Sequence, residues 1–166
     1  MKESGRSMYA PNLISVGIDR YGKSGYSGRI WHQYGDEPVR FTDMTDMLRQ
    51  MEMLYDTWNF PQSSTDSRSF VEKKKPVIQN PIRKAGAQMD VQRVQGRRGD
   101  KGTFLVCVRY RQNSTWQGHV VWAEKNQQQS FRSALELLKL IDSALDIKED
   151  ENTQVCENEE GGWDKQ

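Results

Sequence analysis

The stretch GTFLVCVRYRQNSTWQGHVVWAEKNQQQSFRSALELLKLIDSALD, residues 102–146, decides the fold. Its first part alternates Phe104, Val106 and Val108 on one face with Leu105, Cys107 and Arg109 on the other, a period of two that is typical of a half-buried β-strand. Asn113 and Ser114 form the expected turn, and residues 116–124 return with the same period. The first part therefore predicts an antiparallel hairpin.

The second part of this stretch predicts an amphipathic helix. Ser130 is the expected N-cap, and the helix ends the unit at Asp146. The apolar residues recur at helical spacing, and they are Ala134, Leu135, Leu137, Leu138, Ile141 and Leu145.

The same pattern occurs once more, 90 positions earlier in the chain. The shift needs no gap and aligns Phe104, Val106, Val108, Trp116, Gly118, Val120, Phe131, Leu138, Ile141 and Asp146 with Ile14, Val16, Ile18, Tyr26, Gly28, Ile30, Phe41, Leu48, Met51 and Asp56. In this earlier unit, residues 39–41 suggest a third strand, and a helix capped by Thr42 or Asp43 should end near Trp58. A methionine stripe in that helix is either core or an adaptable groove for a peptide, and Met53 lies off the stripe.

These patterns predict an α+β fold of two tandem hairpin-plus-helix repeats. One copy buries too little apolar surface to offset the entropy of ordering it, so we expect both copies to share one core about a pseudo-twofold axis. The expected organisation is a flexible leader at 1–12, a first repeat at 13–58, a basic linker at 59–102, a second repeat at 103–146 and a disordered acidic tail at 147–166.

Charge is strongly segregated although the net charge is only +1. Residues 71–102 hold nine basic and three acidic residues, whereas residues 147–166 hold two basic and seven acidic residues. Such segments are either solvated and disordered, or the basic one meets a polyanion while the acidic tail competes for the same charge.

No catalytic, metal or cofactor signature is present in the sequence. His32 and His119 occupy different positions within their units, and Cys107 and Cys156 form no paired metal or disulfide motif. There is no phosphate loop or nucleophile elbow, no signal peptide and no membrane span. We therefore expect a cytoplasmic protein without enzymatic activity, small-molecule cofactor or membrane contact.

Aromatic and basic residues on the hairpins are the most suggestive chemical feature. Such residues on one exposed surface suit single-stranded nucleic acid, since bases stack on rings and arginine contacts phosphates. Tryptophans buried in the core are the competing interpretation. The candidate site comprises Arg29, Trp31, Arg109, Arg111 and Trp116 on the hairpins, and Lys73, Lys74, Lys75, Arg97 and Arg98 in the linker.

Two resemblances bear on this hypothesis. Residues 28–48 (GRIWHQYGDEPVRFTDMTDML), 60–70 (FPQSSTDSRSF) and 116–145 resemble small proteins of gut Clostridia with no known activity. The duplicated strands-then-helix order resembles the topology of PUR and Whirly repeats, although those units have four strands and no shared motif is found. This second resemblance implies a curved antiparallel sheet that binds single-stranded DNA.

The sequence thus predicts a binding protein for single-stranded DNA or RNA. The alternative is a protein-interaction adaptor or homodimer whose aromatic sheet face meets another polypeptide. Burial of the tryptophans would weaken both hypotheses, because both require an exposed aromatic face.

Overall fold

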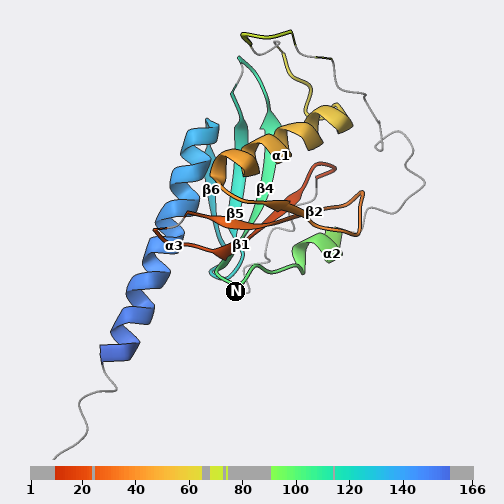
Figure 1. Cartoon of the computed structure of the whole chain (residues 1–166). Coiled ribbons are helices and arrows are strands. Elements are labelled where there is room, and N and C mark those ends of the chain that lie inside the picture. The colour runs from red at the N-terminus through yellow and green to blue at the C-terminus, as the bar shows by residue number, and fades with distance from the viewer. Residues whose placement is uncertain are drawn as a thin grey trace, which may run out of the picture.

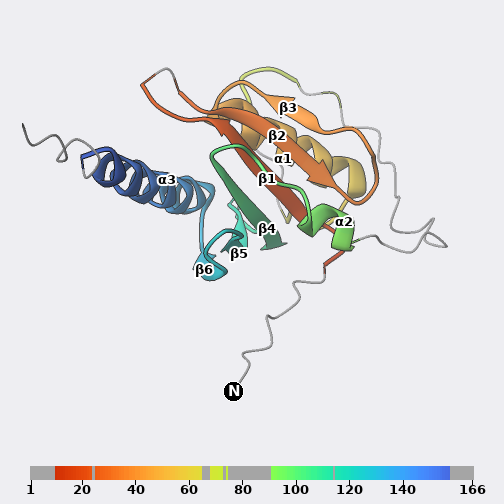
Figure 2. The same ribbon diagram turned by 90° about the horizontal axis from the view of Figure 1, so that it is seen from below.

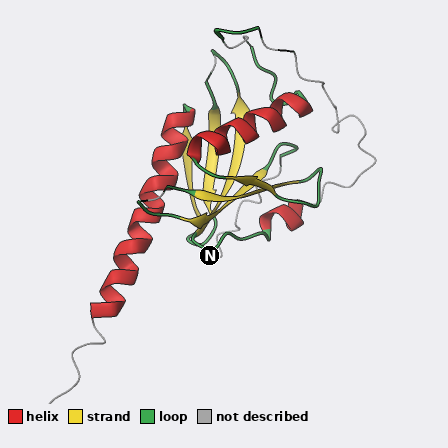
Figure 3. Ribbon diagram, viewed as in Figure 1, coloured by secondary structure: helices red, strands yellow, loops and turns green. Residues whose placement is uncertain are grey.

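The computed structural model describes residues 10–23, 25–64, 68–72, 74, 91–113 and 115–157, with only the helical backbone described for 147–157. Within these residues, six strands form one antiparallel sheet that three helices flank (Figures 1 and 3). The chain is α+β, as predicted. In chain order the elements are β1 (Ile14–Arg20), β2 (Ser27–His32), β3 (Val39–Phe41), α1 (Met44–Trp58), α2 (Val91–Gln95), β4 (Gly102–Tyr110), β5 (Gln117–Trp122), β6 (Gln127–Phe131) and α3 (Ala134–Glu157).

The sheet joins the two halves of the chain at its centre. Its strand order is β3-β2-β1-β4-β5-β6, so each half supplies three adjacent strands. β1 and β4 pair antiparallel, with Ile14 opposite Val106 and Val16 opposite Phe104. The apolar alternation read from the sequence therefore lies at the middle of the sheet, where strands have neighbours on both sides.

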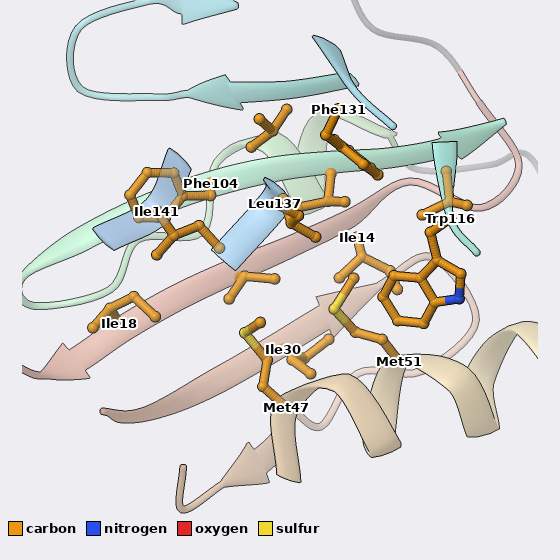
Figure 4. Close-up of a cluster of buried hydrophobic side chains, with 14 of the residues drawn as sticks. Ile14, Ile18, Ile30, Met47, Met51, Phe104, Trp116, Phe131, Leu137 and Ile141 are labelled. Carbon is orange, nitrogen blue, oxygen red and sulfur yellow. The ribbon is translucent and has the colours of Figure 1, made fainter. Parts of the chain in front are cut away.

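α1 and α3 cover one face of this sheet and bury the main core against it. Figure 4 shows Met47 and Met51 of α1 beside Ile14 and Ile30. Leu137 and Ile141 occupy the corresponding place on α3 and are fully buried. The methionine stripe is core, and Met53 is 62% exposed. The peptide-groove alternative therefore loses its basis.

The start of α1 agrees with the sequence prediction, whereas the start of α3 differs from it. Asp43 caps α1, since its carboxylate accepts a hydrogen bond from the amide of Asp46 at 2.8 Å. In the second half, Ser133 instead of Ser130 accepts the equivalent bond from the amide of Glu136. Ser130 belongs to β6, a strand that the sequence analysis missed because Gln127–Ser130 has no apolar alternation.

Two segments expected to lack structure contain helices. α3 continues to Glu157 and extends past the sheet (Figure 2), so the first eleven residues of the expected acidic tail are helical. The expected linker contains α2, which docks on the sheet through Val91 and Val94. The rest of the linker that the structure describes includes a parallel bridge between Ser63 and Arg111.

Each of the two core helices contacts the hairpin of the opposite half of the chain. Arg111, at the end of β4, lies 2.6 Å from Asp56 and 3.2 Å from Glu52 of α1. The ring nitrogen of Trp116 donates to Glu52 at 3.1 Å. In the other direction, Tyr21 and Tyr26 of the β1–β2 hairpin donate to carboxylates of α3, those of Asp146 and Asp142 respectively. The two halves therefore cannot separate without breaking polar contacts on both helices.

Arg111 is the most deeply buried charge in these contacts. Its side chain is 3% exposed, its Nε donates to the carbonyl of Pro61 at 2.7 Å, and its guanidinium lies 5.7 Å from the ring centre of Tyr55. A bulge between Val108 and Tyr110 shifts the alternation of β4 before this residue. Arg111 therefore points to α1, and the prediction that it shares a face with Arg109 was wrong.

We predict that Arg111→Ala lowers the free energy of unfolding by about 2–3 kcal/mol, because it removes a buried cation and leaves the Pro61 carbonyl without its donor. Arg132→Ala is the matched control, since Arg132 is 87% exposed and pairs with Glu136 at the start of α3. The control should cost less than about 0.5 kcal/mol. Urea denaturation measures both values, and equal losses would contradict this role of Arg111.

Candidate nucleic-acid interface

The face of the sheet that points away from α1 and α3 holds five of the ten residues of the predicted site. We call it the helix-free face because neither of these two long helices covers it, although the short α2 docks on it. Residues 91–101, which we call the covering segment, lie across part of it. Val91 and Val94 of α2 pack on Leu13, Leu105 and Val121, which form a second, smaller core. Figure 1 shows α1 and α2 on opposite sides of the β1–β2 strands.

The covering segment fits closely over the middle of the sheet. A side chain at Gly99 would meet the backbone of Gly17 and Ile18 at 2.5–2.6 Å, so only glycine allows this approach. The amide of Gly99 donates to the hydroxyl of Thr103, and the amide of Lys101 donates to the carbonyl of Ile18 at 2.7 Å. This close fit explains why part of the helix-free face is closed to solvent.

Trp31 lies beneath this fit and is 6% exposed. Its ring approaches Gly17 from one side, and the guanidinium of Arg29 lies 4.9 Å from its ring centre. Arg29 in turn makes two hydrogen bonds to Asp19, at 2.7 and 2.9 Å, and lies 3.9 Å from Asp100. Trp31 and Arg29 are thus neighbours as predicted, but the ring is buried and the cation is paired.

Electrostatics favours the charged state of the pair between Asp19 and Arg29. Burial alone would raise the pKa of Asp19, but hydrogen bonds from Arg29 and from the amide of Asp100 outweigh it and hold this pKa below its ordinary value. The hydrogen bond to Asp19 raises the pKa of Arg29. The two side chains therefore form a stable ion pair that holds the guanidinium over Trp31.

Arg109 is exposed on the open part of the helix-free face, beside His119 and Cys107. The Nδ1 atom of His119 lies 3.0 Å from the hydroxyl of Ser130 on β6. Partial burial and the charge of Arg109 lower the pKa of His119, and burial raises the pKa of the Cys107 thiol. In this group of three side chains, Arg109, His119 and Cys107, the cation at neutral pH is therefore Arg109.

The other predicted residues lie in several parts of the molecule. Trp116 is 5% exposed and lies on the helix-covered side with Arg111, where its ring packs at a steep angle on Tyr55. Arg97, Arg98 and Lys74 are exposed. Lys73 and Lys75 lie outside the described residues. The structure thus brings Arg29, Trp31, Arg97, Arg98 and Arg109 to one side of the sheet and places Arg111 and Trp116 on the other.

Arg40 is a functional candidate that the sequence analysis missed. It lies on β3 directly opposite Arg29, it is exposed, and its flanking residues Val39 and Phe41 belong to the core on the helix side. The alternation of Val39, Arg40 and Phe41 carried this signal, because the central residue of such a triplet must face away from the core.

Charge differs between the two sides of the sheet. α1 and the part of α3 up to Asp146, whose side chains the structure describes, together carry six acidic and two basic residues. The helix-free face and the covering segment carry seven basic residues, which are Arg29, Arg40, Arg93, Arg97, Arg98, Lys101 and Arg109. Four acidic residues belong to or contact this side, namely Asp19, Asp100, Asp36 as the partner of Arg93 and Glu124 as the acceptor for the amide of Thr103. A polyanion is therefore attracted to the helix-free side and repelled by the helix side.

The described residues hold no cluster of three or more histidine, cysteine or acidic side chains arranged to bind a metal ion. None of the helices in the described part of the chain combines the length and apolar character needed to cross a membrane.

Comparison of the chain with family models, with curated proteins and with solved structures gave no match.

We predict that Arg29→Ala raises the pKa of Asp19 relative to the wild type, because the variant loses both the hydrogen bond and the positive charge of Arg29, which oppose the effect of burial. Arg40→Ala is the control, since Arg40 acts on Asp19 only through its charge and should raise this pKa less. Carboxyl-carbon NMR titration measures both variants. An unchanged titration of Asp19 in Arg29→Ala would show that the ion pair does not form in solution.

Proposed function

We propose that this is a non-enzymatic protein that binds single-stranded nucleic acid on its helix-free face. The segregation of charge across the sheet supports this proposal most strongly. The contacting residues proposed are Arg97 and Arg98 of the covering segment, Arg109 of β4 and Arg40 of β3. The proposal includes a cytoplasmic location, with which the buried free thiol of Cys107 is consistent.

Phosphate contacts should provide most of the affinity. Trp31 and Trp116 are buried, so they offer no ring on which a base can stack. Tyr110 follows Arg109 in the chain and is 53% exposed, which makes it the aromatic side chain best suited to stack on an unpaired base. Binding through arginine and one ring should depend steeply on salt and only weakly on base sequence.

We also propose that the chain arose by duplication and that a pseudo-twofold axis relates its two halves. Several structural features support this, because they recur with the 90-residue spacing found in the sequence. A side chain at Gly28 or Gly118 would clash with the carbonyl of Gly17 or Cys107, at 1.9 and 2.0 Å. Strand irregularities occur at both Ile18/Arg20 and Val108/Tyr110. The contacts between each hairpin and the opposite helix also correspond, with Tyr21, Tyr26, Glu52 and Asp56 matching Arg111, Trp116, Asp142 and Asp146.

A second candidate function is binding of a basic protein segment on the helix side. The observation that favours it is the excess of acidic residues on α1 and α3, near which Met53 and Leu135 are 62% and 61% exposed. This partner would use the surface that nucleic acid avoids, so variants on the two sides of the sheet distinguish the two functions.

We predict that the triple variant Arg97→Ala/Arg98→Ala/Arg109→Ala weakens binding of a labelled single-stranded oligonucleotide at least about tenfold at low salt. Loss of three phosphate contacts should also reduce the slope of log affinity against log salt by about 2. Fluorescence anisotropy titrations at several salt concentrations, with single-stranded DNA, RNA and a duplex of equal length, give both values.

The matched control removes the same charge from the helix side with Arg49→Ala/Arg132→Ala/Lys139→Ala, all exposed positions. This control should retain wild-type affinity. Equal weakening by both triple variants would show that binding depends on the net charge of the protein and not on the helix-free face. Absence of binding at low salt would contradict the proposed function.

A further inference from the structure

The two edges of the sheet differ in how they are protected against pairing. β3 has three residues, carries Arg40 at its centre and follows Pro38, and all three features discourage a further strand. β6 has five residues, Gln127–Phe131, and all five pair with β5 without a register shift. It contains no charge and no proline. β6 is therefore a straight edge that lacks the usual protection.

The four residues Gln127–Ser130 are all exposed. The cations that flank the strand are directed towards their own chain. The Lys125 ammonium lies 5.8 Å from the ring centre of Trp122, and Arg132 lies 3.6 Å from Glu136. These charges therefore do not lie along the free edge of β6, where they would oppose pairing with another strand.

We propose that β6 pairs antiparallel with β6 of a second copy of this chain, which joins two sheets into one of twelve strands. The strand composition favours a second copy as the occupant. Twofold antiparallel pairing centred on Gln128 places Gln127 opposite Gln129 and Gln128 opposite its own counterpart, and each side-chain amide both donates and accepts hydrogen bonds. A charged peptide would gain no matching ion pair on this strand.

The dimer would extend the proposed nucleic-acid surface, but the dimer proposal does not require that the chain binds nucleic acid. Ser130 contacts His119, which lies beside Arg109, so this group is close to the β6 edge of the helix-free face. Pairing of the two β6 strands brings the two groups to the same side of one continuous sheet. A single strand of nucleic acid could then cross both subunits.

A five-residue strand pair buries little area, so the dimer should be weak, with a dissociation constant on the order of 10 µM. Sedimentation velocity over about 1–500 µM protein should show a reversible monomer–dimer equilibrium in this range. Because backbone hydrogen bonds hold the interface, the equilibrium should change little between low and moderate salt, unlike nucleic-acid binding.

The test variant is Gln127→Lys/Gln129→Lys, which places like charges opposite each other across the edge. Both positions are exposed, so the monomer should keep its thermal stability. We expect the dissociation constant to rise at least about tenfold. The matched control, Gln92→Lys/Gln112→Lys, adds the same charge at exposed positions outside β6 and should dimerise like the wild type.

Single cysteines at Gln128 and Gln129, in a Cys156→Ser background, provide a second readout. Residues near the twofold axis come within disulfide distance, so oxidation should yield a covalent dimer for at least one of them. A monomer at every concentration, or equal weakening by the test and control variants, would overturn the proposal. Dimerisation without nucleic-acid binding would instead leave this proposal intact and contradict only the proposed function.

Discussion

The rest of the structure depends on the contact of each core helix with the hairpin of the opposite half of the chain. The Arg111 guanidinium, held by Asp56, Glu52 and the Pro61 carbonyl, fixes the β4–β5 hairpin on α1. Tyr21 and Tyr26 fix the β1–β2 hairpin on α3. Together with the central pairing of β1 and β4, these contacts give both halves one core. Three strands and one helix alone would bury too little apolar surface to offset the entropy of their ordering.

The shared core also determines what the other face of the sheet can do. Because both helices lie on one side, the opposite side is left for the covering segment, whose Gly99 reaches the backbone of Gly17. Trp31 lies at the same glycine and is buried, and Asp100, the next residue after Gly99, lies close to Arg29. The helix-free face is therefore a charged surface with Arg40, Arg97, Arg98 and Arg109 exposed, rather than an aromatic platform. Its proposed ligand follows from charge more than from stacking.

The strands of both hairpins, the short strand β3 and both ends of α1 could be predicted from the sequence. In these segments apolar residues such as Phe41 and Met51 recur with the period of a strand or of a helix. It could not reveal β6, whose glutamines carry no apolar period, or the continuation of α3 into acidic residues. The position of Arg111 depended on a bulge, and a shift of one residue reverses the face on which a side chain lies. Trp31 lies against Gly17, and the packing of Gly99 on that same glycine is a tertiary contact between residues 82 positions apart that no local pattern predicts.

Native-state hydrogen exchange tests the shared core most directly. If the helices hold opposite hairpins, the slowest amides of β1–β2 and β4–β5 should exchange through one common opening. Arg111→Ala should then lower the opening free energy of both hairpins by the same amount, although Arg111 contacts only α1 and the segment after it. A lower opening free energy in β4–β5 alone, with β1–β2 unchanged, would show that the halves open separately and would contradict the account of one interdependent core.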